Sequence, residues 1–477
     1  MAGVRPQLFI GGQWRDAEGG KTLPVEDPST GNVLVEVADA SAADGVAALD
    51  AAVAVQSEWA ATAPRDRGEI LRSAFELITE NTDDLAMLMT LEMGKPLSES
   101  KAEIGYGAEF FRWFSEEAVR IAGRYSVAPN GQTRLLTLKQ PVGPCLMITP
   151  WNFPLAMGTR KIGPAIAAGC TMVVKPAQQT PLTMLRLADL LTEAGLPDGV
   201  LNVVTTSTTG DVMAPLIADP RLRKLTFTGS TPIGKKLIEQ SAAGVLRVSM
   251  ELGGNAPFLV FDDADLDRAV DGAMLAKMRN VGEACTAANR FIVHESVAEE
   301  FGRRLAERMG AMVVGRGTEE GVEVGPLIDK TQRDKVADLV DDALAKGATA
   351  LTGGVRPDND TYYPPTVLAG VRLDAQVATE EIFGPVAPIF TFAEEQEGID
   401  MANDTEYGLV AYAFTQDHAR VVRVYEGLDT GMVGINQGVV SNPAAPFGGM
   451  KSSGYGREGG AEGIEEYLET KYVGLAL

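Results

Sequence analysis

The stretch CLMITPWNFPLAMGTRKIGPAIAAGCTMVV, residues 145–174, decides the fold class. It begins with a short apolar run at 145–149 and ends with another at 171–174, and both have the composition of strands. Between them, residues 160–168 have the composition and spacing of a helix. Two strands joined by a crossover helix run parallel in a sheet. The stretch therefore predicts an α/β protein with a parallel sheet.

The alternation of strand and helix continues toward the C-terminus. The sequence predicts strands at 200–204 and 225–228, and helices at 184–194, after Gly210 and after Gly229. A second series of α/β units runs from about Glu251 to Gly448, with strands at 258–261 and 431–436 and a helix at 297–309. We therefore predict two doubly wound α/β domains, in which ligands bind at the carboxyl ends of the strands.

The remaining segments lie outside these two series. Residues 8–37 are expected to form short strands and turns, and residues 41–123 have helical periodicity that starts with a capping-box pattern at Ser41 and Asp44. Residues 134–138 predict a strand that is half of a protruding hairpin. The apolar stretch at 467–475 needs a strand partner, which is either this hairpin or another subunit.

Composition excludes several classes of function. The chain has 477 residues, 45% hydrophobic and 22% charged, which is an ordinary globular composition and too long for one core. Its net charge of −23 is spread along the chain and opposes binding to nucleic acid or to anionic membranes. An anionic substrate would therefore need a local cluster of arginines. No run approaches the ~18 apolar residues of a membrane span, and the N-terminus lacks the apolar core of a signal peptide.

Cysteine and histidine usage narrows the chemistry. Cys145, Cys170 and Cys285 are too few and too scattered for a disulfide framework, which favours a reducing compartment, and we expect a cytoplasmic protein. Two histidines, His294 and His418, argue against a histidine-based triad or a multi-histidine metal site. No metal is expected.

Cys285 is the candidate nucleophile. It lies in RNVGEACTAANR, residues 279–290, among small residues that leave the sulfur approachable. A thiolate attacks carbonyl carbon well once its pKa is lowered or a base is near. The alternative is a buried cysteine that acts as a small hydrophobe, as most free cysteines do.

Four loops at predicted strand ends carry further polar residues. In TPWNFP, residues 149–154, the amide of Asn152 could donate to a developing oxyanion. Lys175 could meet ribose hydroxyls or a phosphate, and FTGSTPIG, residues 227–234, places glycine and hydroxyls at a helix start, where phosphates bind. Burial of Glu251 would raise its pKa toward that of a general base. Each residue taken singly also fits a turn or a solvated loop.

Together, the motifs resemble those of the aldehyde dehydrogenase superfamily. PWNFP, KPAQQTP, FTGSTPIG, ELGGNAPFLVF, GEACTAANR, EEIFGPV and PFGGMKSSGYGRE stand in the order and spacing of that family. The similarity extends from about Leu8 to Leu475 and is greatest to the succinate-semialdehyde dehydrogenases. It implies a cofactor-binding domain (1–123 and 140–250), a catalytic domain (251–448) and a small oligomerisation domain of β-strands (124–139 and 449–477), assembled as a homodimer or homotetramer.

The resemblance also implies roles for individual residues. Cys285 matches the nucleophile, Glu251 the general base, and Asn152 an oxyanion donor beside the backbone N–H of Cys285. The implied reaction is thiolate attack on an aldehyde, hydride transfer to nicotinamide, and hydrolysis of the acyl-enzyme by water that Glu251 activates. The implied cofactor contacts are Trp151, Lys175, Gln178, Gly229, Ser230, Leu252, Glu381 and Phe383, with Glu381 at the nicotinamide ribose.

Two groups of positions indicate the cofactor and the substrate. Many NAD-preferring members carry a carboxylate where this chain has the neutral Gln178, so NADP is favoured, with NAD possible. Arg160, Arg279 and Ser441 match the group that holds a distal carboxylate in succinate-semialdehyde dehydrogenases, and guanidinium suits bidentate carboxylate binding. A surface ion pair would be the ordinary interpretation of either arginine alone. The expected substrate is a small carboxylated aldehyde, succinate semialdehyde.

Two departures from the family and three alternatives remain. Ala287 stands where many relatives have a second cysteine, and Glu283 stands where glutamine is common, two residues from the sulfur.

The substrate could instead be glutarate semialdehyde or a medium-chain aldehyde. A CoA-acylating enzyme is disfavoured because Glu251 offers a base for hydrolysis. A non-catalytic NADP-binding protein would be expected to lack the nucleophile or the base, and this chain has both.

Overall fold

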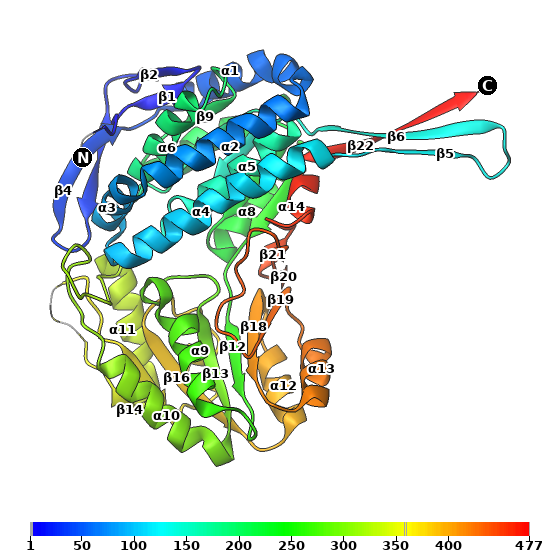
Figure 1. Cartoon of the computed structure of the whole chain (residues 1–477). Helices are drawn as coiled ribbons and strands as arrows, with labels where there is room; N and C mark the ends of the chain where they lie inside the picture. The colour runs from blue at the N-terminus through cyan, green and yellow to red at the C-terminus, as the bar shows by residue number, and fades with distance from the viewer. Residues whose placement is uncertain (1–2, 357, 359, 477) are drawn as a thin grey trace.

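Two α/β lobes and a long three-stranded arm make up the molecule (Figure 1). The computed structural model describes residues 3–356, 358 and 360–476, so the extreme ends of the predicted first domain and of the predicted oligomerisation strands lie outside the described residues. One lobe is built on an eight-stranded sheet and the other on a seven-stranded sheet. The predicted fold class is confirmed.

The first sheet has the strand order β2-β1-β9-β8-β7-β10-β11-β21. Strands β9, β8, β7, β10 and β11 run parallel, and β1, β2 and β21 are antiparallel to their neighbours. The strands are β1 (Leu8–Ile10), β2 (Gln13–Arg15), β7 (Cys145–Ile148), β8 (Met172–Lys175), β9 (Leu201–Val203), β10 (Lys224–Thr228), β11 (Arg247–Glu251) and β21 (Gly454–Tyr455). The helices of this lobe are α1 (Ala42–Ala61), α2 (Pro64–Glu80), α3 (Thr82–Met93), α4 (Leu97–Glu117), α5 (Ala156–Ala168), α6 (Leu182–Glu193), α7 (Thr209–Ala218), α8 (Thr231–Ala242) and α14 (Glu462–Glu465).

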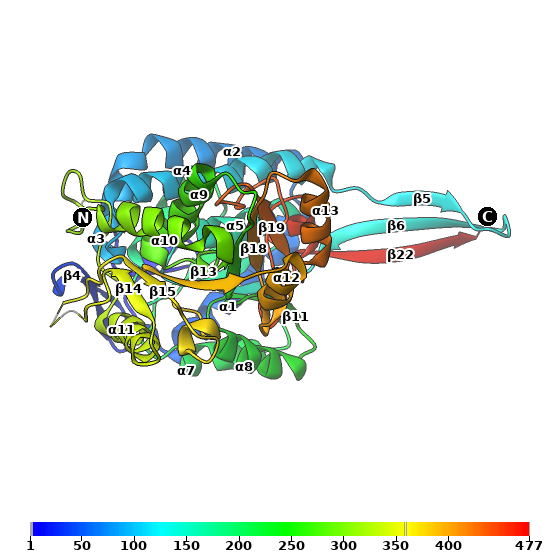
Figure 2. The ribbon, with the colours of Figure 1, turned by 90° about the horizontal axis from the view of Figure 1, so that it is seen from below.

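Helices cover both faces of this sheet because successive strand residues point to opposite sides. Cys145 and Met147 of β7 pack into a core formed with α2 to α6, whereas Leu146 and Ile148 pack against α1, α7 and α8. Figure 2 shows α2 and α4 on one side of the lobe and α7 and α8 on the other. Every residue of β7, β8 and β10 is buried, as expected for a parallel sheet covered on both faces.

The second sheet has the order β14-β15-β16-β13-β12-β18-β19, and all neighbouring strands except β14 and β15 pair in parallel. Phe258 and Val260 of β12 face a core with α9, α10 and α11, and Leu259 faces a second core with α12 and α13. The strands are β12 (Ala256–Val260), β13 (Ala288–His294), β14 (Thr349–Thr352), β15 (Thr366–Ala369), β16 (Val386–Phe392), β18 (Val410–Phe414) and β19 (Met432–Ile435). The helices are α9 (Leu266–Met278), α10 (Glu295–Gly310), α11 (Lys330–Ala345), α12 (Glu395–Asn403) and α13 (His418–Gly427).

The arm is the three-stranded sheet β22-β6-β5, made from β5 (Arg124–Val127), β6 (Thr133–Pro141) and β22 (Leu468–Ala476). The C-terminal strand pairs antiparallel with β6 from Leu468 opposite Pro141 to Ala476 opposite Thr133. The predicted pairing of the tail with the hairpin is thus confirmed. The arm extends away from both lobes (Figures 1 and 2).

Two predictions differ from the structure in detail. Helix α5 begins at Ala156, four residues before the expected start. Pro154 lies just before the helix, where a proline is tolerated because the first helical turn needs no backbone N–H donor. Residues 449–477 do not all belong to the arm: β20 (Met450–Lys451) pairs with β17 (Tyr407–Gly408), and β21 joins the first sheet beside β11.

A further hairpin joins β3 (Thr22–Asp27) to β4 (Asn32–Ala38). Among the described residues, no helix is long and apolar enough to cross a membrane.

Candidate active site

Three of the four predicted loops, at 149–154, 227–234 and Glu251, meet at one cavity because parallel strands place their carboxyl ends at the same edge of the sheet, and the Cys285 loop of the other lobe joins them there. The cavity has a volume of about 230 Å³. It brings together Asn152 after β7, Glu251 at the end of β11, and Cys285 before β13. The other lining residues are Pro150, Trp151, Met157, Thr228, Gly229, Ser230, Leu252, Gly253, Gln332, Lys335, Glu381 and Phe383. Residues more than a hundred positions apart thus share one small space.

The thiol of Cys285 is neutral in this environment. Its side chain is half-buried. Burial raises the pKa of the thiol to about 12, with Glu381 and Glu251 adding to the rise, while Arg160 and Arg279 oppose it. The thiol therefore needs a base to take its proton as it attacks.

Glu251 has the properties of that base. Its side chain is buried, and among the described residues neither carboxylate oxygen has a hydrogen-bond partner. Burial raises the pKa of Glu251 well above its ordinary value, Glu458 adds to the rise, and Arg160, Lys161 and Arg457 oppose it. A buried carboxylate with both oxygens free is costly unless a ligand, water or proton uses it. Glu251 is therefore poised to accept a proton.

Asn152 is held in place by the turn that precedes the nucleophile. Its Nδ2 donates to the backbone oxygen of Glu283 at 3.0 Å. In return, Nδ2 of Asn280 donates to the backbone oxygens of Asn152 at 3.0 Å and of Glu283 at 2.8 Å. One amide hydrogen of Asn152 thus remains for a ligand. These reciprocal bonds fix the Asn152 loop against the Cys285 loop.

The turn before Cys285 is strained. Asn280 and Val281 have φ of 54° and 57°, which is the left-handed region, and this is unfavourable for a β-branched valine. The carboxylate of Glu99 on α4 accepts from the backbone N–H of Asn280. Lys95 donates to the backbone oxygen of Asn152 at 2.8 Å and pairs with Glu103. Glu99, Lys95 and Glu103 belong to no recognisable motif, because nothing in the sequence shows that α4 lies beneath the site.

Glu283 does not lie as an exposed neighbour of the sulfur. Its side chain is fully buried, and its Oε1 accepts from the backbone N–H of Ile328 at 3.1 Å. Burial raises the pKa of Glu283 well above its ordinary value. The carboxyl therefore points into the protein, and its hydrogen bond from Ile328 helps to fix the loop that carries Cys285.

A second cavity, of about 480 Å³, adjoins the first and has the features of a dinucleotide site. Lys175, Gln178, Gly229 and Ser230 line it, as predicted. Ser230 is the N-cap residue of α8, whose N-terminus offers free N–H groups to a phosphate. A Cβ at Gly229 would lie 2.5 Å from the Phe227 ring, so only glycine fits this turn. The residues present fit a bound nicotinamide cofactor.

Lys175 and Gln178 differ in their surroundings. Lys175 is 6% exposed, and burial lowers its pKa to about 8. Gln178 is exposed at the cavity edge. Lys175 has no carboxylate beside it among the described residues, and such a buried ammonium is suited to hold an anionic group, which a neutral Gln178 would not repel.

The loop that carries Glu381 and Phe383 closes the first cavity. The carboxylate of Glu381 accepts from the backbone N–H of Gly254 at 3.1 Å, and burial raises its pKa to about 7. Phe383 has φ of 58° and packs edge-on against Trp151, with ring centroids 5.4 Å apart. Leu252 is buried and lies against Gly234 of α8. All eight predicted cofactor residues thus lie along the two cavities.

The side chain of Arg160 is buried, with 1% of its surface exposed, and only some of its hydrogen-bond donors have partners. Its Nε donates to Glu458, which also accepts from Lys161, and its guanidinium carbon lies 4.0 Å from the centre of the Phe447 ring. Its Nη2 has no partner within the described part of the chain. Burial works to raise the pKa of Glu458, but Arg160 and Lys161 hold it below its usual value. Arg160 therefore keeps one charged donor for a ligand.

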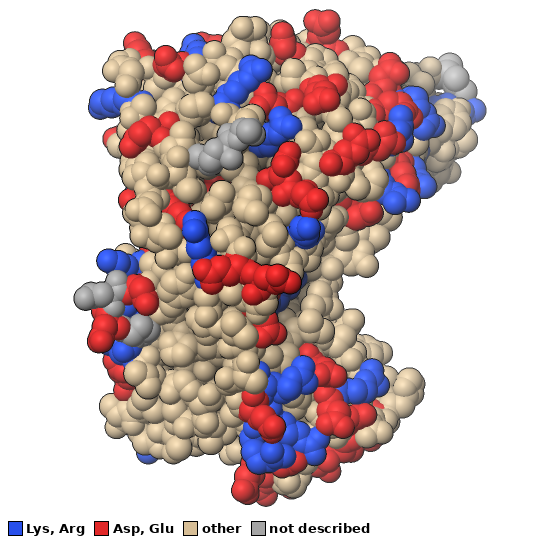
Figure 3. Space-filling model, turned by 60° about the vertical axis from the view of Figure 1, so that its left-hand side comes forward, with Lys and Arg blue, Asp and Glu red and all other residues tan. Residues whose placement is uncertain are grey.

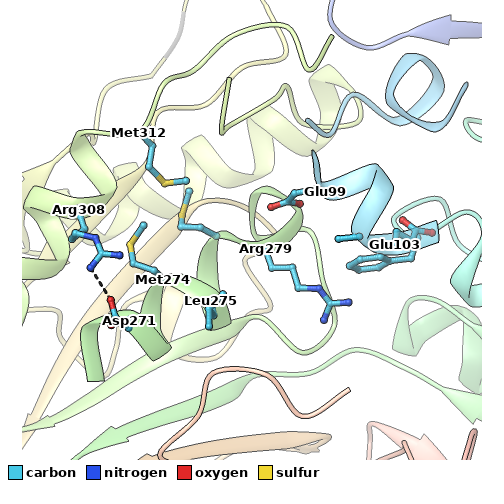
Figure 4. Close-up of a pocket in the computed structure, with 11 residues that line it drawn as sticks. Glu99, Glu103, Asp271, Met274, Leu275, Arg279, Arg308 and Met312 are labelled. Carbon is cyan, nitrogen blue, oxygen red and sulfur yellow. Dashed lines mark hydrogen bonds and ion pairs between the residues drawn. The ribbon is translucent and has the colours of Figure 1, made fainter. Parts of the chain in front are cut away.

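Arg279 comes from the other lobe, and like Arg160 it influences the pKa of both Cys285 and Tyr106. Its guanidinium carbon lies 4.9 Å from the centre of the Phe153 ring and 5.6 Å from that of Tyr106. Ser441 lies near Tyr106 and is among the groups that oppose the rise of its pKa. Figure 4 shows Arg279 at the edge of a separate cavity of about 670 Å³, lined by Met274, Leu275, Met278 and Met312. The structure thus brings the three predicted carboxylate-binding residues together, and it adds Tyr106, which no sequence motif indicated.

Charge on the outer surface is mixed. On the face shown in Figure 3, Lys and Arg side chains lie among Asp and Glu side chains. Arg304, for example, pairs with both Asp267 and Glu300. Such a face offers no continuous positive track for a polyanion.

The fold and the cysteine-centred site place the chain in a known family. The family model described as "Aldehyde dehydrogenase family" matches residues 14–473. The chain belongs to the aldehyde dehydrogenase family, which confirms the resemblance.

Individual relatives are more specific. A protein of Paenarthrobacter nicotinovorans named succinate-semialdehyde dehydrogenase is 59% identical over 445 residues, covering 93% of this chain and 99% of the relative. A glutarate-semialdehyde dehydrogenase of Pseudomonas putida is 50% identical, covering 99% and 98%. The crystal structure of an Escherichia coli NADP-dependent enzyme has a TM-score of 0.98 at 50% identity, covering 99% of this chain and 98% of the other.

Proposed function

We propose that this protein oxidises succinate semialdehyde to succinate with NADP as the cofactor. The observation that carries the proposal is the pair of arginines beside Cys285. Arg160 is buried with an unpartnered Nη2, and Arg279 lies against Tyr106 close to Ser441. Two guanidinium groups and a hydroxyl suit a carboxylate, and a protein of net charge −23 needs such a local positive site to hold an anionic substrate.

The chemistry follows from the protonation states. Cys285 is a neutral thiol, so Glu251 accepts its proton as the sulfur attacks the aldehyde carbon. The free amide hydrogen of Asn152 and the backbone N–H of Cys285 stabilise the oxyanion of the thiohemiacetal. The nicotinamide ring, when bound, supplies the hydride acceptor. Glu251 releases the thiol proton to solvent and then takes a proton from the water that attacks the thioester, so that the carbon–sulfur bond breaks and the sulfur of Cys285 leaves as a thiolate.

NADP is favoured over NAD because of the charge at the cavity edge. Lys175 supplies a buried ammonium, and Gln178 carries no negative charge that would repel a 2′-phosphate. The E. coli structure with a TM-score of 0.98 is described as NADP-dependent, which supports the same choice. NAD remains a possible second cofactor because the rest of the cavity does not depend on the 2′ position.

Glutarate semialdehyde is the second candidate substrate. It carries the same aldehyde and carboxylate with one more methylene, and the Pseudomonas putida relative is named for it. One methylene changes binding by about 1–3 kcal/mol, so both aldehydes should be substrates with unequal kcat/KM.

Assembly, location and domain division are parts of the same proposal. We expect a homodimer or homotetramer in which the arm of β5, β6 and β22 packs against another subunit. Tyr125 and Tyr472 on the arm are 64% and 62% exposed, which favours a partner surface. We also expect a cytoplasmic protein, a cofactor-binding domain of residues 1–123 and 140–250, and a catalytic domain of residues 251–448.

The test compares two aldehydes of equal length, with and without the carboxylate. NADPH formation is measured with succinate semialdehyde and with butanal for the wild type, Arg279→Gln and the surface variant Arg303→Gln. Loss of one charged hydrogen-bonding group, about 2 kcal/mol, should lower kcat/KM for succinate semialdehyde about 30-fold in Arg279→Gln. Butanal turnover and Arg303→Gln should change little. A wild type that prefers butanal would refute the proposal.

A further inference from the structure

Tyr106 stands at the centre of the proposed carboxylate site. It lies on α4 and is half-buried. Its ring packs edge-on against Phe110, with centroids 5.1 Å apart, and borders the small apolar cluster that contains Phe153 and Met157. Packing on these sides limits the ring to one place, so the position of its hydroxyl is well defined.

The contacts of Tyr106 join the three predicted substrate residues. Ser441 lies close enough to its hydroxyl to oppose the rise of its pKa. The guanidinium of Arg279 lies over its ring, 5.6 Å from the centroid, and Arg160 is close enough to influence its ionisation. These three residues come from distant parts of the chain, on α5, after α9 and in the loop after β19. Tyr106 is the side chain that they share.

Tyr106 lies beside Arg279, whose guanidinium carbon is 5.6 Å from the centre of its ring. Burial raises the pKa of Tyr106, with Cys285 adding to the rise, and Arg160, Arg279 and Ser441 oppose it. The phenol therefore stays protonated at neutral pH, and the guanidinium of Arg279 over its ring places it at the end of the site that would hold a distal carboxylate. A protonated phenol has one O–H to donate.

We propose that Tyr106 is a specificity-determining residue that donates a hydrogen bond to the distal carboxylate of the substrate and supports Arg279 with its ring. The proposal rests on the proposed function, since it concerns the same carboxylate. An ionised carboxylate can accept about four hydrogen bonds, so Tyr106 adds to Arg160, Arg279 and Ser441 without competing with them. A neutral aldehyde has no group for this hydroxyl and gains nothing from it.

The test removes only the hydroxyl. Tyr106→Phe keeps the ring, and Tyr125→Phe on the exposed arm is the matched control. Loss of one hydrogen bond to a charged group should raise KM for succinate semialdehyde about tenfold, with kcat changed less than about twofold. KM for butanal should stay within about twofold of the wild type. Unchanged circular dichroism and NADP affinity would show that the fold and cofactor site are intact.

A second variant examines the ring. Tyr106→Leu should weaken binding of succinate semialdehyde further than Tyr106→Phe, because Arg279 loses the aromatic face against which it lies. Equal losses for succinate semialdehyde and butanal in Tyr106→Phe would overturn the inference, as would no loss for either. If the wild type itself shows no preference for succinate semialdehyde over butanal, the proposed function fails instead. The two failures are therefore distinguishable.

Discussion

Alkylation of Cys285 should be slow and steeply dependent on pH. The pKa of about 12 leaves about one thiol in 10⁴ ionised at pH 8, whereas an ordinary cysteine is about one-quarter ionised. Because the thiolate is the reactive form, iodoacetamide should react about two-thousandfold more slowly with this protein than with a free thiol, and the rate should rise about tenfold per pH unit.

A single substitution changes this rate in a known direction. Glu381 is among the groups that raise the pKa of Cys285, and its own pKa of about 7 means that it is charged at pH 8 and largely neutral at pH 6. Glu381→Gln should therefore speed alkylation at pH 8 and leave it nearly unchanged at pH 6.

The assay is alkylation of the cofactor-free protein followed by mass spectrometry, with Cys285→Ala as the control. Cys145 and Cys170 are fully buried and should not react in the native protein. A rate that levels off by pH 9 would refute the reasoning, because it would mean that the thiol is already ionised there. Slower alkylation of Glu381→Gln at pH 8 would do the same.

Three further variants test other parts of the structure. NADP should bind more weakly as pH rises through about 8, because Lys175 loses its charge there, and calorimetry of Lys175→Met should show weaker binding without that dependence. Glu458→Gln leaves the buried Arg160 and Lys161 without this carboxylate, so the free energy of unfolding measured with denaturant should fall by about 3–5 kcal/mol. A fall of less than about 1 kcal/mol would contradict the burial of this cluster. Gly282→Ala places a methyl 2.3 Å from a backbone oxygen at φ of 77° and should abolish most NADPH formation while the purified protein remains folded by circular dichroism.

Local patterns predicted the elements because their physical causes are local. Successive residues of the apolar strand β7 point to opposite faces of the sheet, which determines the helix layer that each one contacts. The predicted capping box at Ser41 and Asp44 is present at the start of α1. The exact start of α5 was predicted less well, since the backbone before it is set by contacts with α4. Glu103 accepts hydrogen bonds from the N–H groups of Leu155 and Ala156, which allows the helix to begin there.

Site residues within recognisable motifs were predicted, and those that act through the tertiary fold were not. Cys285, Glu251 and Asn152 line one cavity as expected. Tyr106 on α4 and Lys95 in the turn before it reach the site only because this helix packs beneath it, and an ordinary helical sequence carries no signal of that. Glu458 belongs to a recognised motif, yet its pairing with Arg160, nearly three hundred residues away, depends on the fold.

The most direct test of the account is to trap the acyl-enzyme. Glu251→Gln cannot activate the hydrolytic water, so mixing it with succinate semialdehyde and NADP at alkaline pH should form no more than one NADPH per subunit. Mass spectrometry should then find one succinyl group, attached to Cys285 and absent from the double variant Glu251→Gln with Cys285→Ala. A succinyl group on another residue, or continued turnover without a thioester, would contradict the assignment of Cys285 as nucleophile and Glu251 as base.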